Sequence, residues 1–278
     1  MKLCSYVHRG NTSYGIFTDS GIIDLGSRLD ATHATLVELL RQDGLGAARE
    51  AAAGVAPDTP LEEVEFLPLT LEPVNVICQG LNFRSHVEEL GRSPDPYPRG
   101  FLRSRQSLVG HLQPLEMPDI SSDFDFEGEY CIVIGRRCHR VNRDEAMEYV
   151  AGFTILMDGS VRDFQRRNIF QGKNFWRSGA LGPCMVTRDA APQWPETRLE
   201  TRLNGKTMQS ATIDELIHDV PALVSYYSQI IEMQPGDVIA TGTAGGVGHS
   251  RDPEVYMRPG DVIEVEISGI GTLRNDVE

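Results

Sequence analysis

The clearest pattern of polar and apolar positions lies at residues 123–135, Asp-Phe-Asp-Phe-Glu-Gly-Glu-Tyr-Cys-Ile-Val-Ile-Gly. Its first half alternates acidic and apolar residues, and its second half is an apolar run that ends at a glycine. A period of two predicts a strand whose successive side chains face opposite sides. Glu127 and Glu129 therefore point to the same side, roughly 7 Å apart along the strand.

Similar patterns predict elements elsewhere in the chain. Apolar runs between turn residues predict strands over 13–18, 21–25, 64–69, 74–78 and 152–157. Helical spacing predicts helices over 35–42, 45–53, 82–91 and 143–150. Asn82 is expected to be the N-cap of the helix over 82–91, and Gly91 its stop. The segment Pro-Gly-Asp-Val-Ile occurs twice, and each copy predicts a turn into a buried strand, at 235–239 and 259–263. The fold class that follows is α+β and strand-rich.

A change in composition divides the chain near residue 70. Prolines at 57, 60, 68 and 73 are typical of a connector. Residues 1–70 hold only scattered polar groups, whereas the segments with candidate chemistry all follow. We therefore expect a small N-terminal α+β domain over 1–70 and a catalytic domain over 71–278.

Composition and charge narrow the class of function. The formal net charge of −14 argues against a nucleic-acid partner and against an anionic membrane surface. The five cysteines are scattered without a CxxC pair, which favours a reducing compartment over secretion. No segment has the apolar length of a membrane span, and the first residues do not resemble a signal peptide. We therefore expect a cytoplasmic protein.

The candidate metal site combines Glu127 and Glu129 with Asp158, which ends the apolar strand predicted over 152–157. Two carboxylates on one face repel each other, and a hard divalent cation relieves that repulsion through its preference for oxygen ligands. Three carboxylates suit Mg²⁺ or Mn²⁺ better than Zn²⁺, because no His or Cys lies near these acids in sequence. The alternative is a solvated strand face beside a turn-forming Asp158, and spacing alone favours that alternative.

A candidate acid–base pair consists of His86 and Glu89, which are three residues apart and share a helix face. A carboxylate that orients an imidazole builds a general base able to activate water at neutral pH. The alternative is an ordinary surface ion pair of small energetic value.

Other polar residues have the chemistry to hold an anionic substrate. Arg162 and Gln165 share a helix face, and a cation beside an amide can bind an oxyanion or a carboxylate. Lys173 lies between a glycine and Asn-Phe, a setting in which lysine can stabilise an enolate. Thr243 lies in the glycine-rich segment 241–248, whose amides can hold a carboxylate but which fits neither a P-loop nor a dinucleotide fingerprint. Taken alone, Arg162 and Gln165 are more typical of an ordinary surface helix, and the alternative for Lys173 is a solvated lysine on a loop.

Taken together, the order of these segments resembles the fumarylacetoacetate hydrolase superfamily, in particular its members of the acylpyruvate hydrolase and 2-hydroxyhepta-2,4-diene-1,7-dioate isomerase type. The resemblance runs from residue 73 to residue 277. The matching segments are 80–86, 126–129, 150–154, 158–165, 172–175, 203–206, 235–243 and 269–275. This sequence departs from the family's usual pattern at Arg103, Trp176, His218 and Ala244. The first two of these departures bear on the identity of the substrate.

The resemblance implies a mixed β-sandwich roll for the catalytic domain, usually paired in a homodimer. It assigns Mg²⁺ or Mn²⁺, with Ca²⁺ able to replace them in crystals, to Glu127, Glu129 and Asp158. It also implies roles for the other candidates: the water-activating dyad for His86 and Glu89, contact with the substrate oxyanion for Arg162, Gln165 and Lys173, and contact with the substrate carboxylate for Thr243.

The activity implied is hydrolysis of a carbon–carbon bond in a 2,4-dioxo acid, an acylpyruvate such as fumarylpyruvate, in the catabolism of aromatic or related compounds. The products would be a 2-oxo acid and a carboxylic acid. One alternative on the same scaffold is a metal-dependent decarboxylase of a β-oxo acid such as oxaloacetate, or a keto–enol isomerase. A further alternative is a non-catalytic protein in which the cation only ties strands together.

Overall fold

The computed structural model describes residues 1–72, 75–192 and 196–278. Its centre is an eleven-stranded mixed sheet. The strands of this sheet are β1 (Lys2–His8), β2 (Asn11–Thr18), β3 (Gly21–Asp24), β4 (Val64–Phe66), β5 (Val76–Gly80), β6 (Arg99–Leu102), β7 (Leu108–Val109), β9 (Gly128–Ile134), β10 (Val150–Met157), β12 (Gly179–Thr187) and β15 (Val238–Thr243). The main path runs in the order β3-β2-β1-β12-β10-β9-β15-β5-β6, while β4 pairs with β1 and β7 pairs with β12. Only the β15–β5 and β12–β7 pairs, among those described, are parallel.

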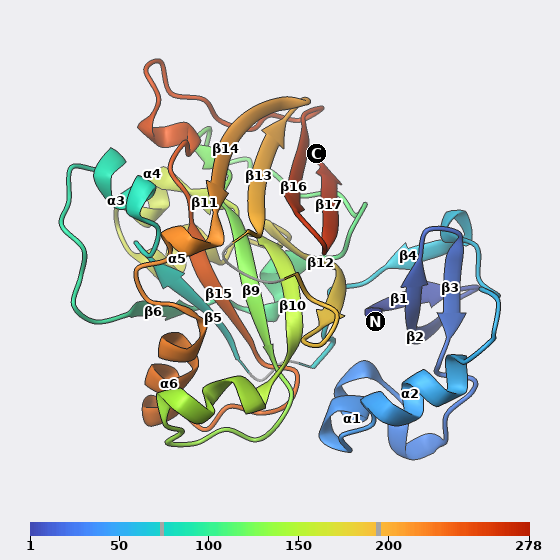
Figure 1. Cartoon of the computed structure of the whole chain (residues 1–278). Coiled ribbons are helices and arrows are strands. Elements are labelled where there is room, and N and C mark those ends of the chain that lie inside the picture. The colour runs from blue at the N-terminus through green and yellow to red at the C-terminus, as the bar shows by residue number, and fades with distance from the viewer. Residues whose placement is uncertain (73–74, 193–195) are drawn as a thin grey trace.

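A second layer packs on this sheet (Figure 1). It is a four-stranded antiparallel sheet in the order β14-β13-β16-β17, formed by β13 (Arg198–Leu203), β14 (Lys206–Thr212), β16 (Val262–Ile267) and β17 (Gly271–Asp276). A short pair, β8 (Phe124–Asp125) and β11 (Ser160–Val161), lies beside the two layers. This is the strand-rich α+β architecture, with a mixed sandwich-like core, that the sequence predicts.

The helices are short. The α-helices are α1 (Leu36–Arg41), α2 (Leu45–Ala52), α3 (Arg84–Glu89), α4 (Arg162–Gln165), α5 (Ile169–Lys173) and α6 (Val220–Ile230). The 3-10 helices are η1 (Ala31–His33), η2 (Leu61–Glu63), η3 (Arg105–Ser107), η4 (Arg143–Tyr149), η5 (Ile213–Glu215) and η6 (Gly248–Ser250). No helix in these parts of the chain is long and apolar enough to cross a membrane.

The central strand β9 divides the core in two. Ile132 and Ile134 belong to the apolar cluster that includes side chains of the four-stranded sheet and of α6. Cys131 and Val133 belong to the cluster on the opposite face, which includes side chains of α1. All seven residues of β9 are buried, as the apolar run 130–134 indicates for a strand covered on both faces.

The N-terminal region extends the main sheet rather than standing apart from it. β1 pairs with β12, with Lys2 opposite Val186 and Leu3 opposite Met185. Figure 1 shows β1–β4 and α1–α2 at one side of the molecule. The division into domains of 1–70 and 71–278 stays a prediction.

The structure corrects several sequence-based expectations. The strand expected over 123–135 is interrupted, because β8 turns to pair with β11 and β9 begins only at Gly128. The helix over 143–150 is the 3-10 helix η4, and the strand over 64–69 ends at Phe66. Pro73, and Val74 of the strand expected over 74–78, lie outside the described residues.

Asn82 is not the N-cap of α3, because Phe83 occupies that place. The Asn82 side chain instead donates to the carbonyl oxygens of His218 and Thr241 and accepts from the His218 N–H. These bonds tie the start of α3 to β15 and to the segment before α6. Gly91 follows the helix at φ +62°, as expected of a stop residue.

Candidate metal centre and catalytic pocket

The ends of two neighbouring strands bring the three predicted metal ligands together. Glu129 is the second residue of β9, Glu127 comes just before that strand, and Asp158 follows β10. The register places Glu129 opposite Leu156, and the Asp158 N–H donates to the Glu127 carbonyl oxygen at 2.8 Å. One carboxylate oxygen from each residue lies within 4.8 Å of the others, and all three residues are buried.

Three buried cations surround the carboxylates. Lys173 Nζ lies 2.6 Å from Glu127 Oε2 and 2.6 Å from Asp158 Oδ2. Arg162 lies 2.7 Å from Glu127 Oε1, and Arg103 pairs with Asp158 Oδ1. Both oxygens of Glu127 and both of Asp158 therefore have a cationic partner.

Glu129 differs from the other two acids. Its Oε2 accepts the Gly242 N–H at 2.9 Å, and it has no ion pair with any residue that the structure describes. Burial raises the pKa of Glu129 well above its usual value, and the nearby charges of Asp158 and Glu127 raise it further. Burial acts in the same direction on Glu127, but Lys173 and Arg162 outweigh it and lower the pKa of that carboxyl to about 2.

The donor set fits a hard divalent cation. All three groups offer carboxylate oxygens, the ligands that Mg²⁺ and Mn²⁺ favour, and they converge in a buried position. A divalent charge there would compensate Glu129, which lacks a cationic partner. Glu127, Glu129 and Asp158 would hold the ion.

The cluster opens into a pocket of about 510 Å³. Seven of the nine predicted site residues line it, namely His86, Glu127, Glu129, Arg162, Gln165, Lys173 and Thr243. Asp158 and Glu89 do not line the pocket, but each contacts a residue that does, Lys173 and His86 respectively.

The predicted dyad is formed on α3. His86 Nδ1 lies 3.1 Å from Glu89 Oε2, and the Gly246 N–H donates to Glu89 Oε1 at 2.9 Å. Partial burial raises the pKa of Glu89, but the hydrogen bonds from His86 and Gly246 outweigh it, so the net pKa is lowered. An ionised Glu89 can orient the imidazole and stabilise its protonated form.

Three residues predicted to contact the substrate already have hydrogen-bond partners within the fold. Arg162 Nη1 donates to Gln165 Oε1 at 2.8 Å, so the two residues share one face of α4 as their spacing indicates. The Thr243 hydroxyl donates to the Gly128 carbonyl oxygen at 3.0 Å and accepts from Gln209 Nε2 at 2.7 Å.

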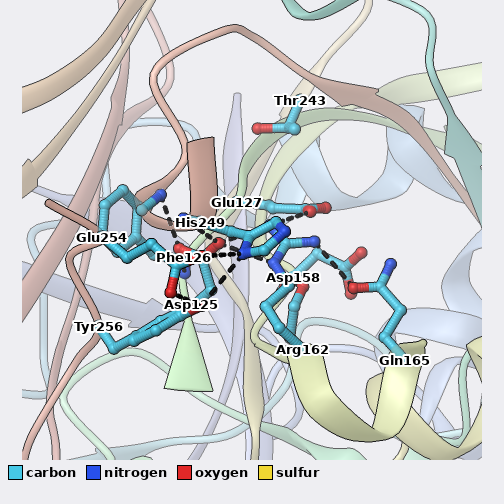
Figure 2. A network of polar contacts seen from close by, with 12 residues as sticks. Asp125, Phe126, Glu127, Asp158, Arg162, Gln165, Thr243, His249, Glu254 and Tyr256 are labelled. Atoms are coloured by element: carbon cyan, nitrogen blue, oxygen red, sulfur yellow. Dashed lines mark hydrogen bonds and ion pairs between the residues drawn. The ribbon is translucent and has the colours of Figure 1, made fainter. Parts of the chain in front are cut away.

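Sequence reasoning missed Asp125, His249 and the part that Arg103 plays. Asp125 Oδ2 accepts from Arg162 Nε at 2.7 Å and from the His249 N–H at 3.0 Å, so it joins the loop after β15 to the carboxylate cluster (Figure 2). The alternating pattern contains Asp125 but does not separate it from other acids. For Arg103 the sequence indicates only a departure from the family's pattern, because its contact partner Asp158 lies 55 residues further along the chain.

Comparison with known proteins is consistent with this geometry. The family model described as "Fumarylacetoacetate (FAA) hydrolase C-terminal" matches residues 75–278. The chain is 34% identical over 262 residues to the rat protein named oxaloacetate tautomerase Fahd2a, mitochondrial, an alignment that covers 92% of this chain and 84% of the rat protein.

Solved structures show the same fold. A fumarylacetoacetate hydrolase from psychrophilic Exiguobacterium antarcticum has a TM-score of 0.83 at 32% identity, covering 100% of this chain and 99% of that one. A maleylpyruvate hydrolase from Sphingobium sp. SYK-6, in complex with manganese(II) and pyruvate, has a TM-score of 0.83 at 26% identity, with coverage of 100% and 98%.

Proposed function

Since this chain belongs to the fumarylacetoacetate hydrolase family, we propose that it catalyses divalent-metal-dependent keto–enol tautomerisation of a short β-oxo dicarboxylate of the oxaloacetate type. The observation that carries the proposal is a buried carboxylate cluster at the base of a pocket whose other charged lining residues are cationic or histidine. The similarity to relatives named oxaloacetate tautomerases over 92% of the chain supports it.

The charge of the pocket fits a dianion. Among its described lining residues only Glu127 and Glu129 are acidic, whereas Arg92, Arg99 and Arg166 are cationic. Arg99 pairs with Asp95 and Arg166 with Asp123, but Arg92 has no acidic partner in the described part of the chain. On a protein of net charge −14, such local positive charge attracts an anion. We assign the 2-oxo carboxylate to the end of the pocket where the cluster would hold a divalent cation, and the second carboxylate to these arginines.

Tautomerisation moves a proton between C3 and the oxygen on C2 through an enolate. When bound by Glu127, Glu129 and Asp158, a divalent cation supplies positive charge that favours the enolate. Lys173 and Arg162 add fixed positive charge at the same wall of the pocket. Asp125 holds the Arg162 guanidinium in place, so little reorganisation accompanies the change in charge. The reaction consumes no water.

The proposal is tested with oxaloacetate prepared in its enol or keto form. Metal-dependent equilibration should be followed by the enol absorbance, with Mn²⁺, Mg²⁺ or chelator, while released CO₂ is measured in parallel. Glu127→Gln serves as the inactive control. Release of CO₂ as the main product would show that the enzyme is a decarboxylase rather than a tautomerase. Stabilisation by metal without turnover of any oxo acid would overturn the proposal in favour of a structural cation.

A second candidate is hydrolysis of an acylpyruvate, and the formed His86–Glu89 dyad favours it. In that reaction His86 would take a proton from water as the water attacks the carbonyl carbon distal to the oxo acid. We expect His86→Ala to lower any hydrolysis of fumarylpyruvate about 10²-fold or more, and to lower tautomerisation less than tenfold. An equal loss of hydrolysis and tautomerisation would mean that His86 has the same role in the two reactions.

The homodimer and the cytoplasmic location that the sequence leads us to expect stay predictions. Light scattering of the purified protein tests the first, and imaging of a tagged chain in its native cell tests the second.

A further inference from the structure

A second histidine with a carboxylate partner faces the same pocket as His86. His249 lies in η6, directly after the glycine-rich loop, and it lines the pocket together with Glu127, Glu129 and Lys173. No sequence motif marked it. The family resemblance assigned it no role, and the cluster does not use it as a ligand.

The backbone of His249 is held by the network that holds Arg162. Asp125 Oδ2 accepts the His249 N–H at 3.0 Å, and Asp125 Oδ1 accepts the Gly248 N–H at 2.8 Å. The same carboxylate pairs with Arg162, which in turn pairs with Glu127. His249 is therefore tied to the carboxylate cluster through two charged side chains.

The contacts of the ring define its tautomer. Nδ1 lies 3.0 Å from Glu254 Oε1 and 3.1 Å from the Tyr256 hydroxyl, and that hydroxyl donates to Glu254 Oε2 at 3.0 Å. Because the single hydroxyl proton of Tyr256 is committed to Glu254, and because a carboxylate only accepts, the proton of the neutral ring lies on Nδ1. Nε2 is then a free base, and no described residue forms a hydrogen bond with it.

The surroundings support this arrangement. Glu254 and Tyr256, the partners of Nδ1, do not line the pocket, whereas His249 does. Figure 2 shows Glu254 and Tyr256 on the opposite side of Arg162 from Gln165. Partial burial and the bond to Glu254 raise the pKa of Tyr256, which keeps its hydroxyl protonated as a donor.

We propose that His249 is a catalytic acid–base residue for keto–enol exchange, and that Glu254 and Tyr256 are positioning residues that set its tautomer. This inference rests on the proposed function. The C3–H bond breaks as the proton passes to Nε2, its electron pair forms the C2–C3 double bond, and the carbonyl π electrons move to the oxygen on C2. That oxygen then receives the proton from the imidazolium. The net change is an isomerisation that needs no co-reactant.

The test compares wild type, His249→Gln and His249→Ala in the presence of Mn²⁺. Tautomerisation of oxaloacetate is followed by absorbance, and uptake of deuterium at C3 is followed by NMR in D₂O. We expect His249→Gln to lower kcat and C3 exchange by about 10²-fold, with KM and the Kd for Mn²⁺ within threefold of wild type. Imidazole should restore part of the activity of His249→Ala. Glu254→Gln should lower kcat by about tenfold.

His8→Gln is the matched control, because His8 also pairs with a glutamate at 3.1 Å, Glu63, but lies in the N-terminal region. It should keep full activity. If wild type turns over oxaloacetate and His249→Gln does so within threefold, or if only KM or metal affinity changes, the role of His249 is wrong and the proposed function stands. If wild type shows no exchange at all, the proposed function fails, and the role of His249 fails with it.

Discussion

The two walls of the pocket are built differently. The inner wall is the carboxylate cluster of Glu127, Glu129 and Asp158 together with Lys173, Arg162 and Arg103, of which Asp158 and Arg103 lie outside the pocket lining. The side chains of Lys173 and Asp158 are only 2% and 1% exposed. The outer wall consists of the His86–Glu89 and His249–Glu254 pairs, whose glutamate side chains are 22% and 48% exposed.

The difference follows from the elements that carry each wall. The register of β9 and β10 fixes the positions of the charged residues in the inner wall, so these residues are buried as part of the core of the fold. The outer wall stands on α3, of six residues, and η6, of three, which contribute little to the core. We therefore expect changes in the inner wall to alter stability and activity together, and changes in the outer wall to alter activity alone.

The largest effect is expected for Glu129→Gln. Loss of one of three ligands should lower turnover at least about 10³-fold and abolish the rise in Tm that Mn²⁺ gives the wild type. Without metal the variant should be more stable by about 1 kcal/mol or more, because it removes a carboxyl whose ionised form is disfavoured by burial and by the charges of Asp158 and Glu127. Differential scanning fluorimetry with Mn²⁺ and with EDTA measures both. A Tm that still rises with Mn²⁺ as in the wild type would show that Glu129 is no ligand.

Arg103→Leu tests whether the inner wall depends on its cations. Arg103 is fully buried and pairs with Asp158, so its loss leaves Asp158 with Lys173, which it shares with Glu127, as its remaining cationic partner in the described part of the chain. We expect a loss of about 3–5 kcal/mol of unfolding free energy in EDTA, and a smaller loss in saturating Mn²⁺, whose charge compensates Asp158. Urea unfolding measures the two values.

The exposed Arg136–Asp43 pair at 3.1 Å is the control for this experiment. Arg136→Leu should cost less than about 1 kcal/mol and show no dependence on metal. The expectation that the charges of the inner wall contribute to stability would be wrong in either of two cases. The two variants could lose equal amounts of unfolding free energy, or the loss for Arg103→Leu could be unchanged by metal.

The sequence predicts site residues only where the pattern that marks them lies within a few neighbouring positions. Alternation around Glu127 and an acid at the end of an apolar strand made these residues candidate ligands, but spacing alone favoured a solvated face, and the family resemblance was needed to assign them the metal. The strand itself proved discontinuous. The three-residue spacing of His86 and Glu89 was likewise enough to predict their contact.

Contacts between distant segments had no such signal. Pattern alone does not place Leu3 opposite Met185 in one sheet, nor Arg103 against Asp158. The contacts of Asn82 are with β15 and with the segment before α6, which are distant in sequence. From the local sequence alone, its polar side chain is typical of a helix N-cap. His249 acquires its partners only through the fold of residues 248–256.

The smallest effect is expected at the mouth of the pocket, where Arg92 has no acidic partner among the described residues. An exposed ion pair with the second carboxylate of the substrate is worth about 1 kcal/mol, so Arg92→Ala should raise KM for oxaloacetate about fivefold and leave kcat within twofold. Salt should reduce the difference, because it screens exposed charges. Arg84→Ala is the control from α3, since Arg84 donates to the Asp214 carbonyl oxygen and does not line this pocket. A change in kcat with Arg92→Ala would mean that Arg92 acts in the reaction itself, and a change in Tm would mean that the segment after α3 is part of the stable core.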